Sequence, residues 1–243
     1  MIYHRSTRGF IGTIFLAILL VCVVVEASEK QWVSVGDAMP DFTLKSYQGE
    51  TVSLSDYKGR NVMLMFPRGY AYEGGWCHFC FYRHAQLFAR QSVGNIPEHL
   101  DLQILYVFPY DKGSIENWIA ALPSALKSVD DMKNPSDYGE LDEGMKKFVD
   151  IIRKVAPEAI TLPEGEEAPT PFPLLLDEER NVSNRFGLFQ TEWSGSKVDQ
   201  NIPAVYLIDR EGILRFKYIS QHTFDRPSFD YLFEIFSLWE KSD

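Results

Sequence analysis

The sequence predicts an α/β fold in which a central mixed β-sheet is flanked by helices. Two near-continuous apolar runs, 61–66 and 102–108, have the length and composition of strands that are buried on both faces. Between them, the segment 80–90 places apolar residues such as Phe81 and Ala85 at helical spacing. This strand–helix–strand order implies two parallel strands that are joined by a right-handed crossover.

Two predicted hairpins add antiparallel strands and so make the sheet mixed. Residues 42–44 and 52–54 flank the turn 48–50, which is typical of an N-terminal β-hairpin. Residues 204–208 and 214–219 have strand character and are joined by a tight turn.

The remaining pattern predicts one more strand and four more helices. The strand is expected over 172–176, and the helices over 114–121, 141–155, 181–186 and 227–240. Ser114 is the expected cap of the first of these helices, and Pro123 is expected to interrupt it.

Two cysteines, Cys77 and Cys80, lie at the junction between the strand 61–66 and the helix that follows it. A helix N-terminus offers free backbone N–H groups and the positive end of the dipole, and both favour an anion. Because the thiolate is the nucleophile in sulfur chemistry, this position predicts Cys77 as the attacking residue. Cys80 lies on the same turn and can attack a mixed disulfide on Cys77, which releases the partner.

Two other interpretations of this pair compete with the redox one. A zinc site usually needs a second pair of ligands, but the third cysteine, Cys22, lies in the N-terminal leader. His78 and His84 have a zinc-like spacing, yet they overlap the cysteine pair. No metal and no cofactor are therefore predicted. A purely structural disulfide stays open as an alternative, because the chain has the features of an exported protein.

The segment Trp76-Cys77-His78-Phe79-Cys80 resembles the Trp-Cys-x-x-Cys centre of thioredoxin-fold proteins. The surrounding sequence is similar to the AhpC/TSA, peroxiredoxin-like redoxin family. The segments that carry this second resemblance are 36–44 (GDAMPDFTL), 52–60 (VSLSDYKGR), 172–177 (FPLLLD) and 202–209 (IPAVYLID). The resemblance implies one thioredoxin-like domain over 34–243, with a helical insertion at about 122–168. That insertion is expected either to pack as a solvated excursion on the sheet edge or to serve as a lid or docking element.

Three further residues are expected to support the cysteines. The resemblance implies that Pro203 is the cis-proline that lies against the pair in the thioredoxin fold; the alternative is a proline at the first residue of a strand, where it is tolerated. Trp76 is expected to shield the disulfide and to offer partners a flat apolar surface, and its alternative role is simple packing. His78, if protonated, would favour the Cys77 thiolate, and its alternative role is a solvent-exposed spacer.

The sequence departs from the peroxiredoxin pattern at the residues that bind peroxide. Gly74 stands three residues before Cys77, where that family has a threonine, and the arginine that should precede the late strand is missing. Arg68 and Arg83 are the candidate substitutes, since peroxide reduction needs donors around the leaving oxygen. The proton-handling aspartate of thioredoxins is also missing, and Met65 is the nearest position.

Composition limits the partners of the protein. The 243 residues are 45% hydrophobic and 24% charged, which are values of a globular protein with one well-buried domain. The net charge of −10 and the lack of a basic run argue against nucleic acid as a partner.

The N-terminus has the features of a targeting segment. Arg5 and Arg8 precede an uncharged, mostly apolar run over 9–25, and Ala27 offers a small-residue cleavage site. Residues 1–27 are thus expected to be a cleaved signal peptide or an uncleaved membrane anchor, with the body exported to the periplasm or another extracytoplasmic compartment.

These observations together predict an extracytoplasmic thiol–disulfide oxidoreductase in which Cys77 attacks and Cys80 resolves. Its expected partners are protein thiols or disulfides, or a thioredoxin-type reductant. One alternative is a peroxiredoxin-like thiol peroxidase with Cys77 as the peroxidatic cysteine. The other is a non-catalytic binding module that a structural disulfide stiffens.

Overall fold

The predicted parallel strands form the middle of a seven-stranded mixed sheet. The computed structural model describes residues 33–162 and 170–239, and its sheet has the strand order β11-β10-β3-β6-β7-β1-β2. The parallel strands are β3 (Asn61–Phe66), β6 (Leu102–Phe108) and β7 (Leu174–Leu176). The antiparallel strands are β1 (Thr43–Ser46), β2 (Thr51–Ser53), β10 (Ala204–Ile208) and β11 (Leu214–Ile219). The α/β fold class is confirmed, with both hairpins at the predicted positions.

Alternation along the central strands divides the interior into two cores. On β3, Met63 belongs to one core, whereas Val62 and Leu64 belong to the other. Successive side chains of a strand point to opposite faces, so a strand covered on both sides must be apolar throughout. This is why the predicted bounds of β3 and β6 match the observed ones.

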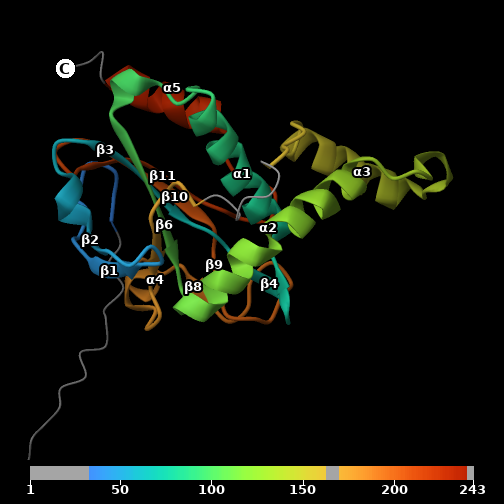
Figure 1. Ribbon diagram of the computed structural model, residues 1–243, viewed down its shortest axis with the longest axis horizontal. Helices are drawn as coiled ribbons and strands as arrows, with labels where there is room; N and C mark the ends of the chain where they lie inside the picture. Colours follow the sequence, from blue (N-terminus) through green and yellow to red (C-terminus); the bar gives the residue numbers. More distant parts are fainter. Residues whose placement is uncertain (1–32, 163–169, 240–243) are drawn as a thin grey trace, which may run out of the picture.

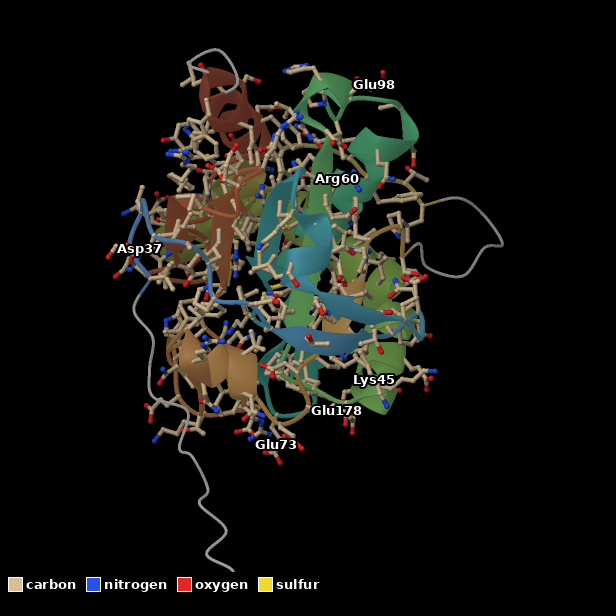
Figure 2. All side chains as sticks on the ribbon, turned by 90° about the vertical axis from the view of Figure 1, so that its left-hand side faces the viewer. Asp37, Lys45, Arg60, Glu73, Glu98 and Glu178 are labelled. Carbon is tan, nitrogen blue, oxygen red and sulfur yellow. The ribbon has the colours of Figure 1, made fainter. Side chains whose placement is uncertain are left out.

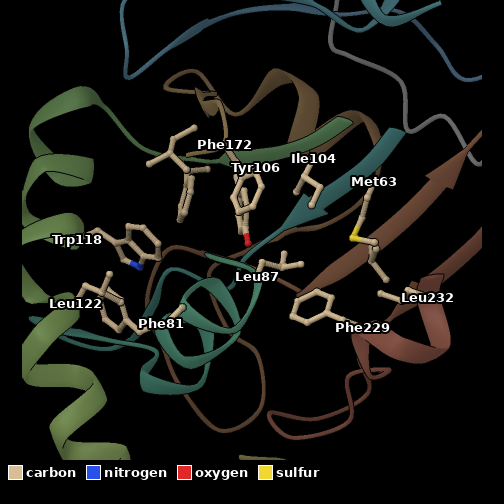
Figure 3. Packing of buried hydrophobic residues seen from close by; sticks show 14 of the residues in the cluster. Met63, Phe81, Leu87, Ile104, Tyr106, Trp118, Leu122, Phe172, Phe229 and Leu232 are labelled. Carbon is tan, nitrogen blue, oxygen red and sulfur yellow. The ribbon is translucent and has the colours of Figure 1, made fainter. Parts of the chain in front are cut away.

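Three helices cover one face of the sheet: α1 (His78–Ser92), α2 (Lys112–Lys133) and α5 (Phe229–Trp239). Figure 3 shows the interface between these helices and the sheet, in which Phe81 of α1 and Trp118 of α2 pack beside Tyr106 and Phe172. The opposite face is covered by α4 (Asn181–Arg185), by the short 3-10 helix η1 (Leu54–Tyr57) and by the loops beside them.

The remaining elements are short or lie outside the sheet. They are α3 (Glu143–Val155), the 3-10 helices η2 (Glu98–Leu100) and η3 (Tyr138–Glu140), and two small two-stranded sheets, β4 (Tyr70–Tyr72) with β5 (Gly75–Trp76) and β8 (Phe189–Gln190) with β9 (Gln200–Asn201). In the described ranges no helix is long and apolar enough to cross a bilayer. The predicted signal peptide or anchor at 1–27, and residues 163–168 of the predicted insertion, lie outside the described residues.

The prediction that Pro123 interrupts a helix at 114–121 is wrong. Helix α2 begins at Lys112 and continues through Pro123 to Lys133, and its cap is Asp111, whose carboxylate accepts a hydrogen bond from the Ser114 N–H at 2.7 Å. An interior proline costs a helix about 3 kcal/mol or more. Here the helix continues because Leu122, Ala125 and Val129 are buried beyond and beside the proline.

The helical segment after Pro123 packs against α1 instead of lying on the sheet edge. Val129 of α2 and Ala156, just after α3, form a buried cluster with Phe79 and the two cysteines. The Tyr82 hydroxyl of α1 accepts a hydrogen bond from the Glu158 N–H at 2.9 Å. In Figure 1, α3 lies at the right of the molecule, and the β1–β2 hairpin lies at the left.

Charged side chains of both signs lie around the outside of the molecule. Figure 2 shows this on the side of the N-terminal hairpin, where its labelled residues are Asp37, Lys45, Arg60, Glu73, Glu98 and Glu178. The two signs of charge are thus interspersed on this side of the molecule.

Candidate functional site

Hydrogen bonds fix the segment between β3 and α1 in a position that makes Cys77 the N-cap of α1. The Cys77 N–H donates to the Gly69 carbonyl at 2.8 Å. Gly69 has a φ of +77°, and a Cβ there would lie 2.3 Å from the Tyr110 side chain. The Tyr110 hydroxyl in turn accepts from the Tyr70 N–H at 3.0 Å and donates to the Asp199 carbonyl at 2.8 Å. The start of α1 is therefore fixed to the segment that follows β6.

The two predicted cysteines form a hydrogen-bonded thiol pair. The Cys80 thiol donates to the Cys77 sulfur, with 2.9 Å between the two Sγ atoms. Both residues are buried, with exposed fractions of 2% for Cys77 and 6% for Cys80. Because a disulfide has a sulfur–sulfur distance of about 2.05 Å, the pair can be oxidised with little movement of the helix.

The surroundings drive the two thiol pKa values apart. The hydrogen bond from Cys80, together with the charges of Arg226 and Arg68, lowers the pKa of Cys77 to about 6 against the opposing effect of burial. Burial, and then the hydrogen bond given to Cys77, raises the pKa of Cys80 well above its ordinary value. At neutral pH Cys77 is thus the thiolate and Cys80 the protonated donor.

Arg226 is a site residue that the sequence did not reveal. Its Nη2 lies 3.9 Å from the Cys80 Sγ, and its guanidinium stacks over the Phe79 ring with 5.0 Å to the ring centroid. The other guanidinium nitrogen, Nη1, donates to the Thr223 carbonyl. Arg226 follows Cys80 by 146 positions in an irregular segment before α5, so only the fold brings it to the cysteines.

Arg68, a candidate peroxide-site residue, is a buried cation on the Cys77 side. Its guanidinium donates to Gln200 Oε1 and Ser196 Oγ at 2.7 Å each and to Thr223 Oγ1 at 3.3 Å. All these partners are neutral, so among the described residues no carboxylate offsets its charge. The positive charge therefore acts on the Cys77 thiolate, whose pKa it helps to lower.

Cys77 borders a groove of about 150 Å³, which we call the Cys77 groove. Arg68, His78 and Thr223 contribute polar groups to its wall. The rest of the wall is mostly apolar or aromatic. It comes from the β4–β5 hairpin, the start of α1, the end of α2, α3 with the residue after it, and the segment before α5: Ala71, Tyr72, Trp76, Phe79, Val129, Met132, Phe148, Ile152, Ala156 and Phe224. The helical segment after Pro123 therefore supplies one side of the entrance to Cys77.

Trp76 and His78 both lie half-buried in the wall of this groove. The Trp76 ring stacks on Tyr70 with 3.7 Å between the ring centroids, so the same ring that borders the groove is also fixed by packing. Burial lowers the pKa of His78, which keeps its ring neutral at neutral pH. The cationic role that the sequence suggested for His78 falls instead to Arg226 and Arg68.

Cys80 borders a separate and narrower space of about 40 Å³, which we call the Cys80 cavity. Pro203 and Met65 line it together with Cys80, so both residues lie near that cysteine. The expected cis peptide before Pro203 is wrong, because the described residues contain only trans peptides. The chain on both sides of this peptide is held in an extended form that leads into β10. The Ile202 N–H donates to the Leu188 carbonyl, and the Pro203 carbonyl accepts from the Ser220 N–H. The peptide therefore keeps the trans form, which is the intrinsically favoured one.

Arg83, the second candidate for a peroxide site, lies on the Cys80 side and not with Arg68. Its side chain lines the Cys80 cavity and stacks on Phe229 with 3.5 Å to the ring centroid. Burial, followed by the like charge of Arg226, lowers the pKa of Arg83 to about 9, so it is still a cation at neutral pH. The structure thus places one candidate arginine on each side of the cysteine pair.

Comparisons with known proteins agree with this fold. The AhpC/TSA family model matches residues 35–217. A cysteine-to-serine mutant of peroxiredoxin 6 from Arenicola marina is 12% identical with a TM-score of 0.54, and the match covers 86% of this chain and 74% of that one. A thiol peroxidase from Chromobacterium violaceum is 14% identical with a TM-score of 0.48, covering 88% of this chain and 91% of that one. None of the curated protein sequences compared with the chain matches it.

The family match covers well over half of the sequence and includes both cysteines. The TM-score of 0.54 shows that the first of the two structures shares the fold of this chain, in which helices flank a central mixed sheet. With its hydrogen-bonded thiol pair at the start of α1, the chain belongs to the AhpC/TSA family of thioredoxin-fold redoxins.

Proposed function

We propose that the protein is a thiol–disulfide oxidoreductase whose redox centre is the Cys77–Cys80 pair. The observation that carries this proposal is the 2.9 Å contact between two thiols whose pKa values are shifted in opposite directions. A low-pKa thiolate is the better attacking group, and a protonated neighbour within bonding reach can complete the exchange.

The reaction with a disulfide substrate follows from this arrangement. The Cys77 thiolate attacks one substrate sulfur, a Cys77–substrate disulfide forms, the substrate S–S bond breaks, and the leaving thiolate takes a proton. Cys80 then loses its proton and attacks the Cys77 sulfur, which releases the second substrate thiol and forms the Cys77–Cys80 disulfide. The substrate gains two electrons and the pair loses two, and the reverse sequence oxidises a dithiol.

The Cys77 groove supports a polypeptide as substrate. A space of about 150 Å³ with aromatic walls accepts one apolar side chain beside the reacting sulfur. Protein thiols or disulfides are therefore the proposed partners, and a thioredoxin-type reductant can restore the dithiol.

We place this activity outside the cytoplasm. The support is the sequence alone: Arg5 and Arg8 before the uncharged run 9–25, and the cleavage site near Ala27. A reporter enzyme fused after Asp243 should be active only outside the cytoplasm, and a soluble cytoplasmic protein with an intact N-terminus would contradict this.

A second candidate function, thiol peroxidase, is favoured by the Arg68–Thr223 contact in the wall of the Cys77 groove. A guanidinium and a hydroxyl near the thiolate are donors that a leaving oxygen needs. The Cys77 thiolate would attack the peroxide, the O–O bond would break, and the leaving oxygen would take a proton. Cys80 would then attack the resulting sulfenic acid and release water as the disulfide forms.

Thiol trapping of two single substitutions tests the proposal. Cys80→Ser keeps the attacking thiolate and removes the resolving one, so mixed disulfides with substrate proteins should accumulate. Cys77→Ser should give none. The measurement is mass spectrometry of trapped adducts, with and without hydrogen peroxide.

Each other function gives a different result in the same experiment. A peroxidase would consume peroxide rapidly, and Cys80→Ser would accumulate Cys77 sulfenic acid with no trapped protein. A binding module with a structural disulfide would give neither adduct, and both substitutions would lower stability by similar amounts.

A further inference from the structure

Residues that line the Cys80 cavity carry buried hydrogen-bonding groups without a partner in the part of the chain that the structure describes. Three such atoms belong to residues that line it: Arg83 Nε, Tyr106 Oη and Ser220 Oγ. Their side chains are 7%, 2% and 3% exposed, so the surrounding solvent does not reach them directly. A buried polar group with no partner is destabilising, and three around one small space indicate a ligand there.

The three groups belong to residues of different elements that line the same cavity. Arg83 lies on α1, Tyr106 on β6, and Ser220 follows directly after β11. Figure 3 shows the Tyr106 ring leaving the sheet with its hydroxyl directed toward the α1 layer. Burial raises the pKa of Tyr106, so the group is a neutral hydroxyl that can donate.

The charge around the cavity selects an anion. Arg83 is buried, and its hydrogen bonds to described residues go to the Gln86 side-chain oxygen at 3.4 Å and the Pro227 carbonyl at 2.8 Å. Arg226 also lines the cavity, and among the described residues no carboxylate pairs with either arginine. Arg226 already acts on the Cys77 thiolate, whose pKa it lowers, whereas Arg83 is a buried cation with no such counter-charge among the described residues. A buried charge without a counter-ion is costly, and an anion beside Arg83 would offset that cost.

The volume of the cavity limits the size of the ligand. About 40 Å³ has room for one to a few water-sized atoms, and most of its wall is apolar. We propose that the Cys80 cavity is a binding site for a small inorganic anion of about the size of a halide, held by Arg83, Tyr106 and Ser220 with the charge of Arg226. This site is separate from the Cys77 groove and does not depend on the proposed redox function.

Thermal unfolding of the full-length chain tests the site with chloride as the probe. Sodium gluconate at equal ionic strength is the reference, because gluconate is too large for a space of about 40 Å³. Chloride should raise the unfolding midpoint in a saturable way beyond gluconate, and the chloride NMR line should broaden on adding protein. Equal midpoints in the two salts, together with an unbroadened chloride line, would overturn the proposal in favour of water alone.

Substitutions assign the effect to the cavity. Arg83→Gln removes a charged donor and should weaken chloride binding by about tenfold or more. Tyr106→Phe removes a neutral donor and should weaken it by roughly two- to tenfold. Tyr206→Phe, a buried tyrosine of the opposite core, and Arg90→Gln, an arginine later on α1, should leave chloride binding unchanged. A loss of chloride binding in these controls as large as in the cavity variants would contradict the assignment.

Tyr106→Phe also separates binding from a purely structural role. If the hydroxyl serves only the anion, the variant should unfold in gluconate at the wild-type midpoint or above it, because an unpartnered buried group is removed. Lower stability in both salts with unchanged chloride binding would contradict the proposal. Should Arg83→Gln fail to fold, Tyr106→Phe combined with Ser220→Ala carries the same test.

Discussion

The two sulfurs of the pair lie 2.9 Å apart, yet they face different surroundings. Cys77 borders a groove of about 150 Å³ with mostly apolar walls, whereas Cys80 borders a cavity of about 40 Å³ that Arg83 and Arg226 line. Cations act on both thiols, because Arg226 and Arg68 lower the pKa of Cys77 and Arg226 also lowers that of Cys80. The two pKa values still differ, because the largest effect on Cys77 is the hydrogen bond from Cys80, which lowers its pKa, whereas the largest effect on Cys80 is burial, which raises its pKa. Two sulfurs in contact thus differ in acidity because one accepts the hydrogen bond between them and the other donates it from a buried position.

The largest change in the reactivity of Cys77 is expected when the hydrogen-bond donor, the Cys80 thiol, is removed. Cys80→Ala removes the leading cause of the low Cys77 pKa, so that pKa should rise from about 6 toward the ordinary value of a cysteine, about 8.5. The thiolate fraction falls at neutral pH, and alkylation of Cys77 should slow by up to about tenfold. The slowing is less than the change in thiolate fraction, because a more basic thiolate is a better nucleophile.

The matched control for that variant is Cys80→Ser. A serine hydroxyl can still donate to the Cys77 sulfur, so the Cys77 pKa should stay closer to about 6 than in Cys80→Ala. The measurement is the pH dependence of alkylation by a neutral reagent, which reports the thiolate. Equal midpoints in the serine and alanine variants would show that the hydrogen bond is not the cause.

The second prediction concerns the wall of the Cys77 groove. Ile152 of α3 is 4% exposed, whereas the adjacent Ile151 is 45% exposed. If α3 unfolds together with the sheet, Ile152→Ala should lower the free energy of unfolding by about 2–4 kcal/mol, the usual cost of truncating a buried isoleucine. Ile151→Ala should change it by no more than about 0.5 kcal/mol.

Urea unfolding of the two variants measures this difference. Equal small effects would show that the segment after Pro123 is an independent attachment and not part of the cooperative unit. That result would also weaken the case for the groove as a fixed binding surface, since Val129 and Ile152 would no longer hold its wall in place.

The fold was predictable where the signal is local. The bounds of β3, β6, β10 and β11 followed from apolar runs and a tight turn, and Cys77 at the start of α1 followed from its place after β3. The prediction that Pro123 ends a helix failed because the burial of apolar side chains of α2 outweighs the one hydrogen bond that the proline removes. That burial cannot be recognised from the sequence around Pro123.

The charges of the site were much harder to foresee. Arg226 acts on the pair across 146 positions, and no pattern marks it. Arg68 and Arg83 were named together as candidates, yet they lie on opposite sides of the cysteines because one precedes α1 and the other is on its second turn. For His78, adjacency in sequence left both a cationic role and that of an exposed spacer open, whereas the fold half-buries the ring and burial lowers its pKa.

The smallest effect is expected from Arg226, although it lies 3.9 Å from the Cys80 sulfur. Its charge lowers the pKa of both thiols, so Arg226→Gln should raise both. Because Arg226 is only half-buried, water screens its field, and the interaction should be worth about 0.2–1 kcal/mol. Alkylation of Cys77 at a pH just below its midpoint should therefore slow by about two- to fivefold, and added salt should shrink that difference.

The matched control is Arg90→Gln. Arg90 carries the same charge on α1, but it pairs with Asp230 and Glu158, away from the sulfurs, so its loss should leave the alkylation profile unchanged. A similar shift in both variants would mean that the net charge of the protein, and not the position of Arg226, sets the acidity of Cys77.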